Sequence, residues 1–156
     1  MEELVLQVFE ILKRKNATLG TAESCTGGML AAEITEVSGS SQFFLGSIVS
    51  YANEVKEKFL GVTKEDLKNH GAVSQVVAEK MAIHVRHQLN CTLSVSITGI
   101  AGPGGGTETK PVGTIWFGVC GPNFVYTEKQ QFSGDRHQIR KSSVEHALKL
   151  LIEKFK

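Results

Sequence analysis

The sequence predicts an α/β protein, a three-layer α/β/α single domain over residues 1–156 with a mixed, partly parallel sheet. Short apolar segments typical of buried strands alternate with segments whose apolar residues recur at helical spacing. Near the C-terminus, two strand-like segments flank Gly121-Pro122-Asn123, which indicates an antiparallel hairpin added to an otherwise parallel sheet. No linker, internal repeat or low-complexity tract divides the chain.

The helices are predicted from apolar periodicity together with signals at their ends. Apolar residues from Leu4 to Leu12 recur at helical spacing, which indicates an amphipathic helix that ends near Asn16. Thr63 and Asp66 resemble a capping box, and Ser74 can cap a longer helix. The predicted helices span about residues 4–15, 27–37 and 53–60, begin after Thr63 and after Ser74, and end with residues 136–155.

The strands are predicted from apolar runs that are too short for helices. The run at 17–22 precedes a segment rich in serine and glycine, and the run at 93–98 leads into a glycine-rich loop. The hairpin signal separates the last two strands. The predicted strands span residues 17–22, 43–51, 93–98, 113–120 and 124–132.

Composition and charge exclude several classes of partner. The 156 residues are 41% hydrophobic and 21% charged, and 17 Lys and Arg against 16 Asp and Glu leave a net charge of +1. Nucleic-acid and membrane partners call for a basic stripe, so neither is expected. The three cysteines lack C-x-x-C spacing, and the chain starts without a secretory signal, so we expect free thiols and a cytoplasmic protein. Composition leaves a homo-oligomer open.

The segment Thr21-Ala22-Glu23-Ser24-Cys25-Thr26-Gly27-Gly28 is the most informative part of the chain. It places a hydroxyl and unpaired backbone N–H groups at a predicted helix start, where an anion or an oxyanion can bind. Ser24 is therefore a candidate nucleophile, and the alternative is a plain N-cap. Gly27 and Gly28 are poor helix formers, which favours close approach of a ligand to the backbone. The segment is not the G-x-S-x-G elbow of α/β-hydrolases.

A serine nucleophile needs a base, and Lys56 is the candidate. It follows the predicted strand that ends at Tyr51 and lies in the first turn of the helix that Asn53 is predicted to cap. Deprotonating an ordinary lysine at neutral pH costs about 4–5 kcal/mol, of which a helix dipole supplies only about 0.3–2 kcal/mol. Burial must therefore lower its pKa, and the alternative is a solvated surface lysine.

The run from Thr98 to Thr107 is a glycine-rich loop after a strand. Successive glycines allow backbone amides to converge on phosphate oxygens, although the run is neither a Walker A loop nor G-x-G-x-x-G. Arg136 and Arg140, at the start of the last helix, are alternative phosphate partners. His84, His87 and Cys91 share helical spacing but lack a fourth ligand, so no metal is expected.

Together these segments resemble the CinA C-terminal domain family, the nicotinamide-nucleotide amidohydrolases. The resemblance covers nearly the whole chain and rests on motifs that occur in the family's order. They are the 21–28 segment, Gly46 to Lys56, Leu60-Gly61-Val62, Thr98 to Gly105, Lys110 to Thr114, and Gly134-Asp135-Arg136 with Arg140. Ser50 and Ala52 depart mildly from residues that the family often has at these positions.

The resemblance implies hydrolysis of the carboxamide of nicotinamide mononucleotide, with no cofactor. It assigns the nucleophile to Ser24, the base to Lys56 and a catalytic tyrosine to Tyr51. The residues predicted to bind this small nucleotide are Thr26, Gly27, Gly28, Asn53, Thr98, Gly99, Gly102, Gly104 and Arg140. Backbone N–H groups near Gly27 are expected to hold the oxyanion. The alternative function is a non-catalytic nucleotide-binding or regulatory module.

Overall fold

A computed structural model describes all residues from Met1 to Lys156. A five-stranded mixed sheet has the order β2-β1-β3-β4-β5. The strands β1, β2 and β3 run parallel to one another, and β4 and β5 form an antiparallel hairpin beside β3. The strand bounds are β1 Leu19–Glu23, β2 Phe44–Val49, β3 Leu93–Gly99, β4 Thr114–Gly121 and β5 Phe124–Gln131. The predicted fold class, with its mixed sheet, is confirmed.

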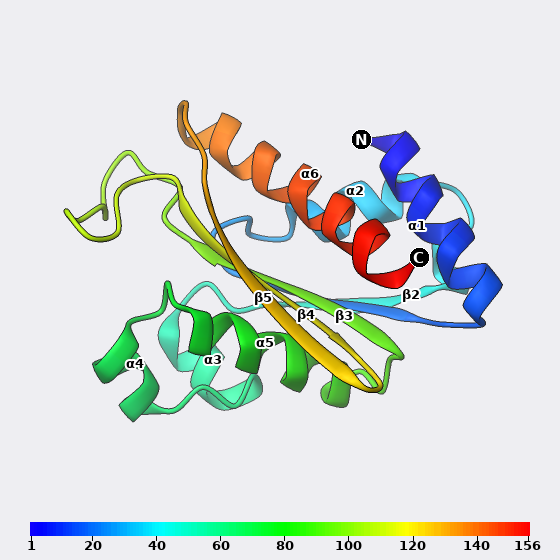
Figure 1. Cartoon of the computed structure of the whole chain (residues 1–156), viewed down its shortest axis with the longest axis horizontal. Coiled ribbons are helices and arrows are strands. Elements are labelled where there is room, and N and C mark those ends of the chain that lie inside the picture. Colours follow the sequence, from blue (N-terminus) through cyan, green and yellow to red (C-terminus); the bar gives the residue numbers. More distant parts are fainter.

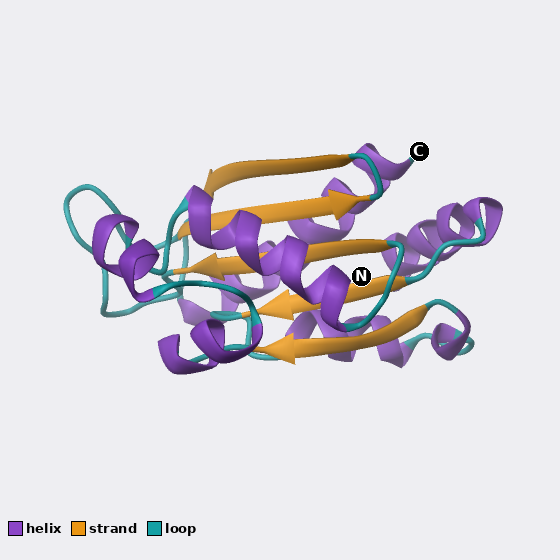
Figure 2. Cartoon of the chain, turned by 90° about the horizontal axis from the view of Figure 1, so that it is seen from below, coloured by secondary structure: helices purple, strands orange, loops and turns teal.

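Helices cover both faces of this sheet (Figures 1 and 2). On one face α2 and α6 pack on the strands and α1 packs on α6, while α5 covers the opposite face with α3 and α4 beside it (Figure 1). The helix bounds are α1 Glu2–Lys15, α2 Met29–Glu36, α3 Asn53–Phe59, α4 Lys64–His70, α5 Gln75–Gln88 and α6 Arg136–Phe155, with a 3₁₀ turn, η1, at Ser40–Gln42.

The core lies on both sides of the sheet. A cluster of 26 buried residues joins the sheet to α1, α2 and α6, and a smaller cluster of six lies under α5. Val77, Met81 and Val85, which recur at helical spacing along α5, are fully buried. This burial follows from helical spacing, which places them on one face.

Several predicted helix ends are confirmed. Thr63 and Asp66 form the reciprocal capping box of α4, and the Ser74 hydroxyl accepts a hydrogen bond from the N–H of Val77 at the start of α5. Asn16 ends α1 in the left-handed conformation, with a φ of 48°. These local signals were sufficient because each one involves residues only a few positions apart.

Two predicted helix starts are wrong. The second helix begins at Met29, and Gly27 and Gly28 precede it with φ of 59° and 95°, so these glycines are needed for left-handed turn conformations. Asn53 is the first residue of α3, and the residue at its N-cap is Ala52, which has no side-chain cap. Neither glycine therefore lies in a first helical turn.

The topology brings three segments together at one edge of the sheet. Because β1, β2 and β3 are parallel, the chain leaves all three at the same edge. Ser24 lies in the turn after β1, Lys56 lies on α3, which follows β2, and the glycine-rich loop follows β3. In open α/β sheets this edge is where ligands bind.

Candidate active site

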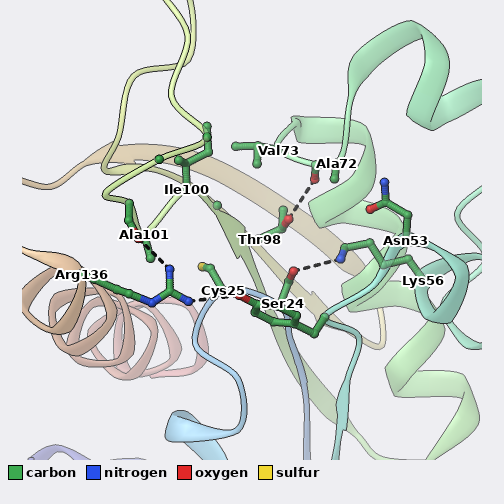
Figure 3. A pocket seen from close by; sticks show the side chains of 15 residues that line it. Ser24, Cys25, Asn53, Lys56, Ala72, Val73, Thr98, Ile100, Ala101 and Arg136 are labelled. Carbon is green, nitrogen blue, oxygen red and sulfur yellow. Dashed lines mark hydrogen bonds between the residues drawn. The ribbon is translucent and has the colours of Figure 1, made fainter.

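Ser24 directly follows β1 and contacts a lysine of α3, the helix that follows β2. The Nζ of Lys56 lies 2.9 Å from the Oγ of Ser24 (Figure 3). The same Nζ lies 2.5 Å from the carbonyl oxygen of Ser50, at the end of β2. Two segments separated by 32 positions thus meet through their side chains, because β1 and β2 are parallel neighbours.

Lys56 is almost completely inaccessible, with 1% of its surface exposed. No carboxylate contacts it, so burial lowers the pKa of Lys56 from 10.5 to about 8. At pH 7 the cost of deprotonation then falls from about 5 to about 1.4 kcal/mol, at ~1.36 kcal/mol per pKa unit. The neutral amine can accept the hydroxyl proton of Ser24 across the contact that the two side chains already make.

The turn from Ser24 to Gly28 is anchored by Glu23, a residue that sequence reasoning missed. The Glu23 side chain is fully buried, and its carboxylate accepts hydrogen bonds from the N–H groups of Gly28, Leu30 and Ala31. The helix start that was predicted to bind an anion is therefore occupied by a carboxylate of the chain itself. Ser24 is not an N-cap, because it lies five positions before Met29.

The carbonyl oxygen of Glu23 links the same turn to the lysine. It accepts hydrogen bonds from the N–H of Ser50, at 2.7 Å, and from the Ser50 hydroxyl, at 3.4 Å. Because the carbonyl of Ser50 in turn accepts from Lys56, the loops after β1 and β2 form one connected network. A capping carboxylate of this kind can be predicted only from the fold, since its partners follow a turn whose shape the sequence did not reveal.

Arg140 contacts the same turn from α6. Its Nε donates to the carbonyl oxygen of Cys25 at 3.2 Å, and its Nη2 donates to that of Thr26 at 2.8 Å. Arg140 was predicted to contact substrate, but it does not line the pocket described below. Thr26, Gly27 and Gly28 also lie outside the pocket lining.

A pocket of about 330 Å³ opens beside Ser24 and Lys56. Volumes of this size accommodate small-molecule ligands. Five residues predicted to bind substrate line it: Asn53, Thr98, Gly99, Gly102 and Gly104. Its lining also includes residues that were not predicted to bind substrate, namely Cys25, Ala72, Val73, Ile100, Ala101 and Gly105, and it includes Arg136, which the sequence left as an alternative phosphate partner (Figure 3).

The glycine-rich loop supplies unpaired donors to this pocket. No protein acceptor bonds the N–H groups of Ala101, Gly102, Gly104 and Gly105. Thr98, at the base of the loop, donates its hydroxyl to the carbonyl of Ala72 at 2.9 Å, which ties the loop to the segment between α4 and α5. Free amides in the lining of a pocket suit an anionic group.

Arg136 and Tyr51 lie together at the pocket. The Arg136 guanidinium donates to the carbonyl of Gly102 at 2.7 Å and to the Tyr51 hydroxyl at 3.1 Å. Tyr51 is 64% exposed, and its hydroxyl forms no hydrogen bond with Ser24 or Lys56. Of the two arginines that the sequence left as alternatives, Arg136 is therefore the one at the pocket (Figure 3).

Cys25 is the other nucleophile-type side chain in the pocket lining. Burial raises the pKa of its thiol to about 12, so the reactive thiolate is nearly absent at neutral pH. The serine hydroxyl is the better-supported nucleophile, because it alone has a base in contact. His84, His87 and Cys91 form no metal-holding group, and no cluster of three His, Cys, Asp or Glu side chains is close enough to bind a metal ion.

Comparison with known proteins gives a family for this fold and pocket. The family model of the CinA C-terminal domain matches residues 1–155. The chain belongs to this family. The resemblance stated from the motifs is thereby confirmed.

CinA-family relatives differ in length. The chain is 43% identical over 156 residues to a nicotinamide-nucleotide amidohydrolase PncC from Enterobacter agglomerans, covering 99% of this chain and 95% of that protein. It is 50% identical to a CinA-like protein from Trichormus variabilis, but it spans only 37% of that relative's length.

Solved CinA-family structures share the fold along nearly the whole chain. A competence damage-inducible protein A from Klebsiella pneumoniae superposes with a TM-score of 0.95 at 33% identity, covering 98% of this chain and 95% of that one. A competence/damage-inducible protein from Agrobacterium tumefaciens gives 0.94 at 37% identity, covering 97% and 93%. No helix has the length and apolar character needed to span a bilayer.

Proposed function

We propose that this CinA-family domain hydrolyses the carboxamide of nicotinamide mononucleotide to nicotinate mononucleotide and ammonia. The relative from Enterobacter agglomerans, aligned over 99% of the chain, is named for amide hydrolysis of a nicotinamide nucleotide. The observation that carries the proposal is the buried Lys56 amine 2.9 Å from the Ser24 hydroxyl, on the wall of a ligand-sized pocket. A nucleophile and base in contact define covalent catalysis of acyl transfer.

In the first half-reaction, neutral Lys56 takes the proton of Ser24 while the Ser24 Oγ attacks the carboxamide carbon. The Lys56 ammonium then returns this proton to the amide nitrogen as the carbon–nitrogen bond breaks, so ammonia leaves and an acyl-enzyme ester remains. The carbonyl of Ser50 holds Lys56 in place through both steps, because it accepts from Nζ in either protonation state.

In the second half-reaction, water attacks the ester and gives its proton to Lys56. The Ser24 oxygen leaves, recovers that proton, and releases the carboxylic acid. Lys56 thus acts as base and as acid in each half. A pKa of about 8 suits both tasks, since neither protonation state is costly near neutral pH.

The oxyanion is proposed to bind the N–H of Cys25, which directly follows the nucleophile, lines the pocket and donates to no protein acceptor. Donors near Gly27 were expected from the sequence, and Gly27 itself donates its N–H to the carbonyl of Ser24. Fixed donors in a water-poor site stabilise such developing charge.

The nucleotide's phosphate and ribose are proposed to bind the glycine-rich loop and Arg136. Ala101 and the Arg136 guanidinium lie on the side of the pocket opposite Lys56 (Figure 3), and Ala101, Gly102, Gly104 and Gly105 have amides without protein acceptors. Tyr51, which the family resemblance makes catalytic, is paired with Arg136. In our proposal it helps to hold the nucleotide, and Lys56 carries the proton without it.

The test is to incubate the purified chain with nicotinamide mononucleotide and measure ammonia and the acid product by chromatography. We expect equal amounts of both, and a mass increase on the protein corresponding to the acyl-enzyme after rapid quenching. Tight binding by calorimetry without ammonia release would instead support a regulatory nucleotide-binding module.

A further inference from the structure

A second cavity, of about 370 Å³, lies beside the candidate active site. It is formed by the end of α4, the start of α5, the loop before β4, and the strands β4 and β5. Val73 lines both cavities, and Trp116 of the second cavity is the register partner of Thr98, which lines the first. The first cavity measures about 330 Å³, so the second is large enough for a small ligand of the same size class.

The ionisable side chains that line this second cavity are all basic. Lys110, Lys129 and the imidazole of His70 line it, and no carboxylate does. Neither lysine forms an ion pair within the chain. By contrast, the surface grooves beside α1, α2 and α6 each contain at least one glutamate. Basic side chains without counter-charges in a concave surface attract an anion.

Lys110 belongs to the segment from Lys110 to Thr114, one of the motifs on which the family resemblance rests. Both ends of this segment line the second cavity, and neither lines the candidate active site. The Nζ of Lys110 donates to the carbonyl of His70 at 2.5 Å, which fixes the ammonium at the end of α4. Because an ammonium has three donors, two remain for a ligand.

Trp116 gives the cavity an aromatic surface. It lies opposite Lys129 in the pairing of β4 with β5, and the Lys129 ammonium lies 6.0 Å from the centre of its ring. The indole is partly exposed, so part of its surface is available for contact. Nucleobases stack on aromatic side chains with little regard to sequence, because every base has a π-face. A ring with an ammonium beside it can therefore bind the base and the phosphate of one molecule.

We propose that this cavity is a second binding site, for a nucleoside phosphate: Lys110 and Lys129 bind its phosphate groups, and its base stacks on Trp116. The lysines alone would serve for inorganic phosphate or pyrophosphate, and the aromatic ring is the observation that favours a nucleoside. The inference goes beyond the proposed amide hydrolysis and does not depend on it, since Ser24 and Lys56 take no part.

The experiment uses the fact that Trp116 is the chain's single tryptophan, so its fluorescence reports on this cavity. The purified protein is titrated with ADP, and inorganic pyrophosphate is then tested as a competitor of the bound ADP. We expect saturable quenching by ADP that weakens as salt is added, because salt screens exposed charges. ADP should bind at least about fivefold more tightly than pyrophosphate, since stacking of a base adds to the affinity.

Four variants locate the bound nucleotide. Lys110→Gln and Lys129→Gln should each weaken ADP binding about fivefold, as expected for the loss of one charge contact near the surface. Lys141→Gln, an exposed lysine of α6, is the matched control and should not change the affinity. Arg136→Gln, in the candidate active site, should also leave the quenching unchanged. Thermal unfolding checks each variant, and exposed Lys129 provides a test even if Lys110→Gln lowers the stability of the fold.

Three results would overturn the proposal. The first is the absence of quenching at millimolar ADP, and the second is equal affinity for pyrophosphate and ADP, which would indicate a site for an anion alone. The third is unchanged ADP affinity in both lysine variants, and a simultaneous loss in Arg136→Gln would place the nucleotide in the candidate active site instead. Ammonia release is measured separately, so failure of this proposal and failure of the proposed function are distinguishable.

Discussion

Two glycine-containing turns leave neighbouring parallel strands, and they are built in opposite ways. The turn after β1, residues 24–28, is held by Glu23 at one end and by Arg140 on its carbonyls. The loop after β3, from Ile100 to Gly106, leaves several amides without protein acceptors, and most of its glycines are exposed. Both segments are rich in glycine, and in both of them some glycines have positive φ.

The difference shows how one edge of the sheet can carry both a rigid turn and a loop whose amides are free to bind a ligand. The nucleophile proposed at Ser24 must hold its geometry between turnovers, and the protein's own charged groups hold the turn that follows it. Amides that receive a ligand must stay unpaired until it arrives. Each half of this comparison can be tested separately.

Ser24→Ala should produce the largest effect. Without the nucleophile, kcat should fall at least about 10⁴-fold, since removal of a catalytic serine in other hydrolases costs about 10⁶-fold. Binding of the nucleotide, measured by calorimetry, should remain, because the glycine-rich loop is untouched. Cys25→Ala is the neighbouring control and should lose less than about tenfold. Turnover by Ser24→Ala within tenfold of the unsubstituted protein would remove the nucleophile assignment.

Lys56→Met should lower kcat about 10³-fold, because general base catalysis contributes about 10²–10⁴-fold. In the unsubstituted protein the rate should rise with pH up to about 8, as Lys56 loses its proton. That acidic limb should be absent from the pH profile of the variant's residual activity. Lys58→Met, an exposed lysine on the same helix, is the control. An acidic limb retained in Lys56→Met would indicate another base.

Lys56→Met should lower kcat but raise the stability of the fold at neutral pH. The pKa of Lys56 is about 8 when folded and 10.5 when unfolded, so the unfolded chain binds more protons between these values. Stability contributed by this group therefore rises with pH from about 8 to about 10.5, and burying the charged form below pH 8 costs on the order of 3 kcal/mol. Lys56→Met should unfold at higher urea concentration at pH 7. A variant less stable than the parent at that pH would contradict this expectation.

Glu23→Gln tests whether the turn after β1 is held by charge. The carboxylate accepts from three N–H groups, and an amide nitrogen in place of one oxygen would face a donor. We expect a loss of about 1–3 kcal/mol in the free energy of unfolding by urea. Glu36→Gln, at the exposed end of α2, is the control and should change it by less than about 0.5 kcal/mol. Equal effects from the two variants would show that the cap does not stabilise the turn.

Gly104→Ala should produce the smallest effect, and it tests whether the glycine-rich loop affects ligand binding without affecting bond cleavage. A Cβ at Gly104 meets no atom within 4 Å, so stability should not fall, but the added methyl group intrudes on the pocket. We expect KM to rise about three- to tenfold with kcat little changed. Gly102→Ala differs, because its φ is 78° and its Cβ would lie 2.5 Å from Val112, so it should also lower the melting temperature. A kcat defect in Gly104→Ala would mean that the loop does more than bind.

Sequence patterns predicted the order of the elements because most of them depend on local contacts. The capping box at Thr63 and Asp66 and the buried face of α5 follow from residues within two helical turns. The hairpin between β4 and β5 follows from its turn residues. The start of α2 was mispredicted, because the sequence alone does not show that Gly27 and Gly28 adopt positive φ and therefore precede the helix.

Residues of the candidate site were predicted where a motif specifies the residue type. They were missed where their contacts depend on the three-dimensional structure. The pair Ser24 and Lys56 and most of the glycine-rich loop were expected, and the structure brings them to one pocket. Glu23 resembled an ordinary strand residue, because its three partners come into reach only after the turn closes. The roles of Arg136 and Arg140 depend on helix orientation, which the sequence leaves open.

The parallel pairing of β1 with β2 has an evolutionary consequence. The side chains proposed to react both come from the stretch between Glu23 and Lys56, whereas the surfaces proposed to recognise the nucleotide come mostly from the second half of the chain. Exchanging the loop between Gly99 and Gly106 for that of a homologue should therefore alter which amide is accepted while bond cleavage itself persists. Reaction and selectivity can then diversify at different rates within one lineage.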